Sequence, residues 1–424
     1  MRRLRGVVTF AALAFATANV ARAQDSTQVT VHSTAQDSTR VDARNGVPID
    51  VELPLGVGLR IPSYDRVNGL SIPWGPTINV GDGRLVIDPT VAYRSNLGKI
   101  DPALAVYAAL TPDSSVALTL AGARGTFTNE GWIRSDLINS IITLGLGHDA
   151  RNYFRADRGE ARLVGRIALP GADEYSEEGA NTVHLFVGAR AERDWSTGWR
   201  PPPAEPLGGM PELPPGGTIA PTPRGPWSFF NRDDQRDGMM RPNPAIDAGR
   251  ITSGLLGGRI DYRSEPVTFL ADLLGEGGAS GTVGGSFRQV TFDGHTGIAT
   301  FAGERIEVDG HLVTTSGGIT PRQRYAYEGG SGTLATVDLL SLGGDHLYFV
   351  DARYVIPVPG IDLPFVGAPF FAPRFAAGAA GVGGYGVPVE NIGFRVGLGP
   401  LRFDAVWNPS THGHDFGFGF AFSR

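Results

Sequence analysis

The 424-residue chain contains no cysteine, which excludes a disulfide framework and any metal site built on thiolates. Charged residues make up only 19% of the chain, against about 25% in ordinary soluble domains. The net charge of -6 favours neither nucleic acid nor anionic lipid as a partner of the whole chain. Beyond the amino terminus no run of 18 apolar residues occurs, so a helical membrane anchor is excluded. Glycine is abundant instead, at 60 residues, roughly twice its usual share of about 7%.

The first residues have the three parts of a secretory signal peptide. "MRRLR" is basic, "GVVTFAALAFATANV" is apolar but short for a membrane span, and "ARAQ" places small residues at Ala21 and Ala23. We therefore expect a cleaved signal peptide over 1–23, with an ordinary buried helix as the alternative. Residues 24–50 are polar and without periodicity, which predicts a flexible or plug-like segment. An exported chain that lacks a spanning helix can cross a membrane only as a closed β-barrel.

From residue 51 onward the chain shows short alternating runs separated by turn residues. The clearest are "VHLFVGARAER" (183–193), "HLYFVDARYVIPV" (346–358), "IGFRVGLG" (392–399) and "LRFDAVWN" (401–408). One face of each run is apolar, as expected for strands whose side chains alternate between two faces. Weaker candidates lie at 67–79, 84–95, 100–111, 114–127, 158–170, 249–262, 265–275, 281–293, 296–308 and 368–384.

The second face of these runs places charges among glycines. A soluble antiparallel sandwich, or a secreted lectin-like barrel, also alternates, but it favours Lys, Thr, Ser and Glu on its outer face. A barrel lumen instead confines polar side chains beside their countercharges. We therefore predict an all-β fold, a transmembrane antiparallel β-barrel over 51–424 with about 14 strands and a range of 12 to 16. The predicted lumen charges are Arg190, Glu192, Asp351, Arg353, Arg395, Arg402 and Asp404.

Two segments interrupt the strand pattern. "SDLINSIITLG" (135–145) has apolar residues at helical spacing behind Ser135 or Asp136 as an N-cap, which predicts one short helix in a loop. The segment 201–227 is rich in Pro and Gly and predicts a long outward loop, because proline cannot donate to a strand ladder.

The carboxy terminus, "HDFGFGFAFSR", places Phe416, Phe418, Phe420 and Phe422 on one face of a strand. Such a row of rings needs an apolar cover, which is either a protein core or lipid. The segment resembles the carboxy-terminal β-signal by which the insertion machinery recognises outer-membrane barrels. The resemblance assigns this insertion signal to Asp415, Gly417, Phe420 and Phe422.

A wider resemblance lies in "YEGGSGTLATVDLLSLGGDHLYFVDARYVIPV" (327–358), "FFAPRFAAGAAGVGG" (370–384) and "IGFRVGLGPLRFDAVWNP" (392–409). These stretches, in this order, are similar to the closing strands of the bacterial surface antigen barrels, the superfamily that includes the outer-membrane assembly factors. "YDRVNGLSIPWG" (64–75) and "DARNYFRAD" (149–157) resemble stretches of its stand-alone members. The family's inward loop carries an Arg-Gly-aromatic tip, but the chain reads "TLATVD" (333–338) there. Residues 24–50 are too few for a periplasmic repeat domain, so we expect a barrel without one.

Motifs for catalysis are weak. The motifs G-x-S-x-G and H-E-x-x-H are absent. The stretch "GVGGYG" (381–386) matches a phosphate-binding pattern, but no helix follows it. The stretch "THGHD" (411–415) could hold a metal, but a turn is the preferred interpretation. We expect no enzyme, catalytic residue, metal or cofactor. The function predicted first is a passive pore or surface scaffold in the outer membrane. The alternatives are a helper in protein or lipid transport and assembly there, and, less favoured, a barrel-embedded hydrolase. The expected partners are outer-membrane lipids and the insertion machinery but not nucleic acid, while a solute or protein partner stays open.

Overall fold

The structure, a computed structural model, describes residues 38–42, 48–170, 181–197, 218–219, 243–358, 360, 368–398 and 401–420. Within these ranges nineteen strands form one sheet, and two small strand pairs stand apart from it. The signal peptide predicted over 1–23 lies outside the described residues. No described helix combines the length and the apolar character that crossing a bilayer requires.

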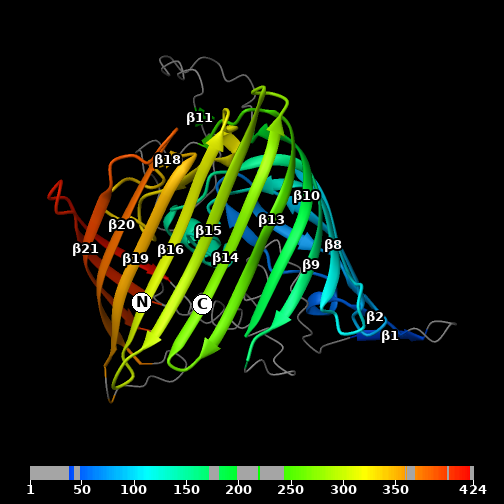
Figure 1. Cartoon of the computed structure of the whole chain (residues 1–424), viewed down its shortest axis with the longest axis horizontal. Coiled ribbons are helices and arrows are strands. Elements are labelled where there is room, and N and C mark those ends of the chain that lie inside the picture. Colours follow the sequence, from blue (N-terminus) through cyan, green and yellow to red (C-terminus); the bar gives the residue numbers. More distant parts are fainter. Residues whose placement is uncertain are drawn as a thin grey trace, which may run out of the picture.

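Fourteen long strands follow one another as an antiparallel meander in which each pairs with the next. The strands lean in one direction and the sheet curves strongly (Figure 1). This antiparallel architecture is the one that the sequence predicts, and the predicted number of about 14 matches the long strands, whereas the whole sheet has nineteen strands. The strands are β6 (Leu85–Arg94), β7 (Lys99–Ala109), β8 (Val116–Phe127), β9 (Phe154–Ala168), β10 (Thr182–Ser196), β13 (Gly249–Ser264), β14 (Val267–Ser280), β15 (Gly285–Ala299), β16 (Arg305–Gly317), β19 (His346–Pro357), β20 (Phe370–Gly381), β21 (Val389–Leu398), β22 (Leu401–Trp407) and β23 (His414–Phe420).

Five shorter strands extend the sheet beyond β6. β4 and β5 share its free edge, and the chain bends between them at Gly75, where a Cβ would lie 2.0 Å from the carbonyl oxygen of Pro89. β3 pairs with β4, β2 with β5, and β1 with β2. Part of the segment 24–50 is therefore strand, which differs from the expectation of an irregular segment. The bounds are β1 (Ser38–Asp42), β2 (Pro48–Glu52), β3 (Ser63–Asp65), β4 (Gly69–Trp74) and β5 (Thr77–Val80), with a 3-10 turn at Pro54–Gly56 between β2 and β3.

The two faces of the sheet differ as the alternation predicts. One face exposes large apolar side chains, such as Leu256 at 68%, Val187 at 55% and Phe403 at 52%. The other face, called the inner face below, carries charged side chains and the buried cluster of Val313, Leu347 and their neighbours. A face of exposed aliphatic and aromatic side chains is what a lipid-contacting strand presents.

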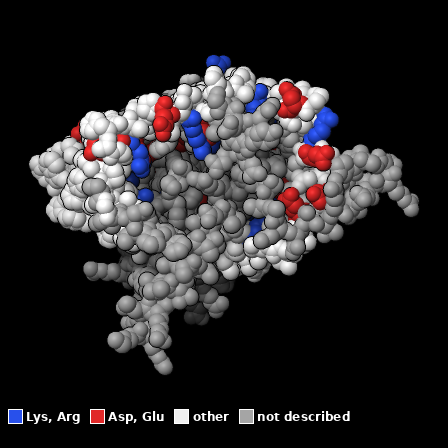
Figure 2. All heavy atoms as spheres, turned by 90° about the horizontal axis from the view of Figure 1, so that it is seen from below, with Lys and Arg blue, Asp and Glu red and all other residues white. Residues whose placement is uncertain are grey.

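The connections at the two ends of the sheet have different lengths. Figure 2 views the end with the short turns, where acidic and basic side chains alternate along the described rim. The opposite end carries the long loops 128–153 and 318–345, and β10 and β13, which flank residues 198–242, meet at that end as well. Long loops at one end and short turns at the other are typical of outer-membrane barrels, whose long loops face outward.

Some expected elements have other boundaries in the structure. The candidate strand 296–308 straddles a turn, because Ala302 (φ 57°) and Gly303 (φ 78°) reverse the chain between β15 and β16. Within the proline-rich segment 201–227, β11 (Thr218–Ile219) pairs with β12 (Asn243–Pro244), so a minimal ladder forms there after all. The remainder of that segment lies outside the described residues. The helix predicted at 135–145 is confirmed as α2 (Asp136–Leu146), with Ser135 as its N-cap.

Candidate functional site

Two loops from the long-loop end fold against the inner face of the sheet. We call them the helical loop (128–153, between β8 and β9) and the glycine loop (318–345, between β16 and β19). Trp132 of the helical loop stacks on His311 of β16, with ring centroids 4.1 Å apart, and lies 5.5 Å from the ring of Phe349 on β19. Leu334 of the glycine loop is fully buried in the same cluster. Both loops therefore occupy the space that the curved sheet surrounds.

Helix α2 shapes the helical loop. The Ser135 hydroxyl accepts from the backbone amide of Ile138, and Gly147 ends the helix in the left-handed region at φ 79°. Asn139 on the helix then holds the returning chain, because its amide nitrogen donates to Asp149 Oδ1 at 2.9 Å and its oxygen accepts from the Ala150 amide at 3.0 Å. The helix thus presents residues 149–153 in one conformation.

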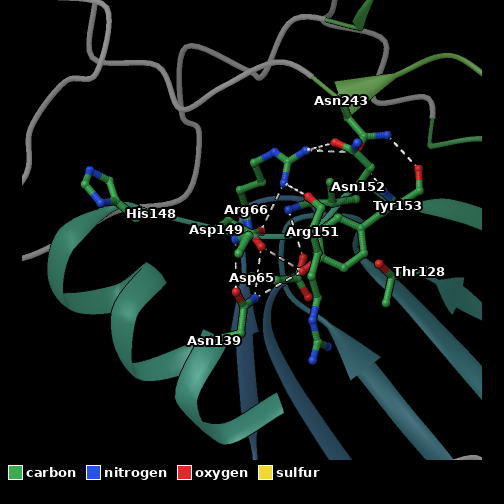
Figure 3. A network of polar contacts seen from close by, with 12 residues as sticks. Asp65, Arg66, Thr128, Asn139, His148, Asp149, Arg151, Asn152, Tyr153 and Asn243 are labelled. Atoms are coloured by element: carbon green, nitrogen blue, oxygen red, sulfur yellow. Dashed lines mark hydrogen bonds and ion pairs between the residues drawn. The ribbon is translucent and has the colours of Figure 1, made fainter. Parts of the chain in front are cut away.

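A buried polar network joins this loop to two distant segments (Figure 3). The backbone amide of Arg66 donates to Asp149 Oδ2 at 3.0 Å, and the Arg66 guanidinium lies 3.3 Å from the same carboxylate. Arg66 Nη2 also donates to Asn152 Oδ1 at 3.2 Å and to Asn243 Oδ1 at 3.0 Å. Asn243 in turn donates to the carbonyl oxygen of Tyr153 at 2.6 Å. The stretches "YDRVNGL" and "DARNYFRAD" are therefore joined directly, through the contacts of Arg66 with Asp149 and Asn152.

The carboxyl groups in the network serve as structural acceptors. Asp149 accepts from Arg66, Asn139 and the Tyr153 hydroxyl, the last at 3.0 Å. Asp65 Oδ1 accepts from two backbone amides of its own turn. Burial, reinforced by the nearby charge of Asp149, raises the pKa of Asp65 to about 6. These contacts position the loop, and they leave the acceptor sites of Asp149 occupied by fixed donors.

The glycine loop is tied to one side of the inner face by Arg324. This residue ends the 3-10 turn Arg322–Arg324 and lies between two buried acids, Glu276 of β14 at 2.9 Å and Glu192 of β10. Both acids and the guanidinium are at most 4% exposed. The adjacent Gln323 donates to Asp194 Oδ2 at 3.0 Å. Buried charges need such partners. If the loop moved away from the strands, Arg324 and the two acids would lose each other as partners or become exposed to solvent.

The other side of the glycine loop is held from the opposite part of the sheet. Arg374 of β20 contacts Asp351 of β19 at 3.0 Å and donates to the carbonyl oxygen of Thr333 at 3.1 Å. The two loops are also joined to each other, since Arg134 Nη2 donates to Ser331 Oγ at 2.6 Å. One polar network therefore connects the two loops with strands β10 and β14 on one side and with β19 and β20 on the other.

The glycine loop also contains a buried acid of a different kind. Glu328 belongs to β17 (Ala326–Glu328), which pairs with β18 (Leu342–Gly344) inside the loop. Its side chain is fully buried beside Gly378 of β20, where a Cβ would lie 2.6 Å from Glu328 Oε2. Neither carboxyl oxygen has a hydrogen-bond partner among the described residues. Burial raises the pKa of Glu328 to about 8.

The predicted lumen charges lie on the inner face, where each of them has contacts. Arg190 contacts Glu160 at 2.7 Å and Glu276 at 3.1 Å, and Arg158 reaches Glu192 at 2.8 Å. The remaining contacts are Arg353 with Glu307 and Asp309, each at 2.7 Å, Arg374 with Asp351, Arg395 with Asp404 at 2.7 Å, and Arg402 over the ring of Phe370 at 4.7 Å. Their assignment as functional lumen charges stays a prediction.

The predicted insertion signal is placed only in part. Asp415 and Gly417 lie in β23, opposite Val406 and Asp404 of β22. Phe420 is the last residue of β23, while its side chain and the whole of Phe422 lie outside what the structure describes. The role of this segment in insertion stays a prediction.

Comparison with known proteins identifies the fold. No protein-family model matches the sequence, and no curated protein is similar to it. Among solved structures, BamA from Haemophilus ducreyi lacking POTRA domains 1–3 aligns over 95% of this chain and 77% of that chain, with a TM-score of 0.50 and 14% identity. The chain has the fold of an outer-membrane assembly-factor barrel. The resemblance seen in the closing strands is thereby confirmed as a likeness of fold.

Two further solved structures align less well. CdiB from Acinetobacter baumannii matches 85% of this chain and 57% of its own, with a TM-score of 0.39 and 10% identity. CdiB from Escherichia coli matches 91% and 67%, with a TM-score of 0.43 and 9% identity. The segment 333–338, which lacks an Arg-Gly-aromatic tip, belongs to the glycine loop, and its contact with the sheet is the hydrogen bond from Arg374 of β20 to the backbone carbonyl of Thr333.

Proposed function

We propose that the protein is an outer-membrane barrel that assists the transport or assembly of protein or lipid, with the loops at its long-loop end facing outward. A single observation carries this proposal. Two loops fold into the space inside the sheet, and one of them, the glycine loop, is held from two sides by the buried arginines Arg324 and Arg374. Such fastening favours a closed resting state, which a barrel that opens only in the presence of a substrate requires.

The inner network supports a mechanical rather than a catalytic role. Its acids, Asp149, Glu192 and Glu276, are engaged by arginines in geometries that hold loops in place. We therefore propose that the protein is not an enzyme, and that its inner charges bias the position of the loops. Export through the predicted signal peptide belongs to the same proposal.

Two measurements test the function together. Purified full-length protein in planar bilayers should give no steady conductance, and a strain that lacks it should show reduced amounts of other outer-membrane barrels or altered outer-membrane lipid. The matched variant is Arg324→Ala, which should produce intermittent conductance because one fastening of the glycine loop is lost. Steady large conductance of the wild-type protein, together with an unaltered outer membrane in the deletion strain, would favour the passive pore and overturn the proposal.

A further inference from the structure

The outward face of the sheet contains a depression of about 960 Å³ near the long-loop end. Its floor is a cross-strand row of small residues in register, Ala161 on β9, Ala189 on β10, Gly254 on β13 and Gly277 on β14. A second row, from Gly159 to Ala279, runs beside it. A Cβ added at Gly254 or Gly277 would meet nothing within 4 Å, so the floor is open. We call this depression the outer trough.

A belt of large apolar side chains forms one rim of the trough. Leu163, Val187 and Leu256 form the next outward row toward the short-turn end, and they are 45%, 55% and 68% exposed. Exposed aliphatic side chains on the outside of a membrane barrel contact acyl chains. The trough therefore continues the lipid-facing belt, but with its surface recessed by the missing side chains.

The opposite rim is basic. Arg193 of β10 and Arg250 of β13 are directly opposite each other on the outward face, and both are exposed. Like charges in such cross-strand positions destabilise a sheet. The acid nearest in register, Asp157, is already engaged by Arg124 through two contacts of 2.5 and 2.8 Å. Arg288, also exposed, flanks the trough in register with Gly277. Among the described residues, no hydrogen bond or ion pair neutralises Arg193 or Arg250. The chain as a whole is nevertheless acidic.

The distance between the apolar rim at Val187 and the basic rim at Arg193 suits an amphiphilic molecule. Arg193 is six residues from Val187 on the same strand, a distance of about 20 Å at the rise of a β-strand. A lipid whose acyl chains continue the apolar belt into the trough would therefore place its headgroup at the arginines. Paired guanidinium groups suit phosphate, because they donate in a fork to its oxygens.

We propose that the outer trough binds a phosphorylated lipid of the outer leaflet, with its acyl chains over Gly254 and Gly277 and its phosphate at Arg193, Arg250 and Arg288. The assignment of the leaflet rests on the proposed function, because it follows from long loops that face outward. The occupant is a lipid rather than free phosphate, since the recessed floor adds apolar contact that an inorganic ion cannot use. Binding of this kind anchors the barrel wall that carries Glu192 and Glu276 on its other face.

The test measures lipid binding to purified full-length protein in detergent by native mass spectrometry, with lipid A as the probe and dephosphorylated lipid A as comparator. Arg193→Gln with Arg250→Gln should weaken lipid A binding by roughly tenfold or more, because charge-assisted bonds are lost. Gly277→Leu should weaken it by filling the floor. The matched control is Arg84→Gln with Arg166→Gln, which removes two exposed arginines at the short-turn end and should leave binding unchanged.

Three results would each overturn the proposal. These are equal affinity for the dephosphorylated lipid, an unchanged affinity in the arginine double variant, and an equal loss in the control. Inorganic phosphate at millimolar concentration should not displace lipid A, and complete displacement would assign the site to a free anion instead. Heat-modifiable migration of every variant verifies that it is folded. Failure of the bilayer and deletion-strain tests with lipid binding intact would reject the proposed function alone.

Discussion

The buried carboxyl group of Glu328 should make the stability of the folded protein depend on pH. The carboxyl group is fully buried, and burial raises the pKa from 4.5 to about 8, a shift that no cation among the described residues opposes. The folded protein therefore keeps the Glu328 proton at neutral pH, whereas the unfolded chain has released it. Replacing Glu328 with Gln, which cannot ionise, removes this difference between the two states.

The sign follows from proton linkage. Between the unfolded pKa of 4.5 and the folded pKa of about 8, the folded state binds more protons than the unfolded state, so stability falls as pH rises. The contribution is fully present below pH 4.5 and is lost as pH passes through 8. A difference of 2.5 between pH 4.5 and pH 7 corresponds to a loss of about 3 kcal/mol.

Urea unfolding in detergent micelles between pH 5 and pH 9 measures this effect. The wild-type protein should lose about 3 kcal/mol more than Glu328→Gln between pH 5 and pH 8, and the variant should be the more stable above pH 7. The exposed Glu265→Gln is the matched control and should follow the wild-type curve. Parallel curves for wild type and Glu328→Gln would show that the buried carboxyl does not titrate as its surroundings imply.

Two further substitutions test the fastening of the loops. Arg324→Ala removes the cation that Glu192 and Glu276 share but leaves them Arg158 and Arg190, so it should cost about 1.5–3 kcal/mol in urea unfolding, while Arg324→Lys should recover part of it; a cost below about 0.5 kcal/mol would contradict a buried, charge-assisted contact. Asn243→Ala removes the amide that joins Arg66 to residue 153 and should cost about 1–3 kcal/mol, seen also as faster proteolysis within the helical loop; an unchanged digestion pattern would count against the cross-link.

Local periodicity accounts for the parts of the fold that the sequence predicts well. In 183–191, 392–398 and 401–407 one face is apolar without interruption, and the pleat alone then decides which side chains point outward. The helix at 136–146 is predicted because a cap and apolar residues at helical spacing occur together. Arg395 and Asp404 belong to neighbouring strands of one hairpin, so their pairing follows from register.

The loop anchors depend on contacts that no local pattern records. Arg324 stands in "PRQRY", which reads as an ordinary polar turn, and its partners are 132 and 48 residues away. Glu328 resembles any surface glutamate until β17 and β18 bury it. The short strands β1 and β2 are missed for another reason, because five-residue segments offer too few alternations to distinguish them from irregular chain.

The position of one arginine explains how the segment 333–338 of the glycine loop is held without an arginine of its own. An arginine on a loop tip must find an acid on the wall, and both side chains are then constrained in sequence. Arg374 reverses this arrangement, because the wall supplies both the cation and its counterion Asp351, and the loop contributes only the carbonyl of Thr333. Any residue has a backbone carbonyl, so the segment 333–338 is free to lose the arginine while the loop remains held. At this contact the cation belongs to the strand, where the ladder between β19 and β20 fixes its geometry, whereas Arg324 fastens the loop with a cation of the loop itself.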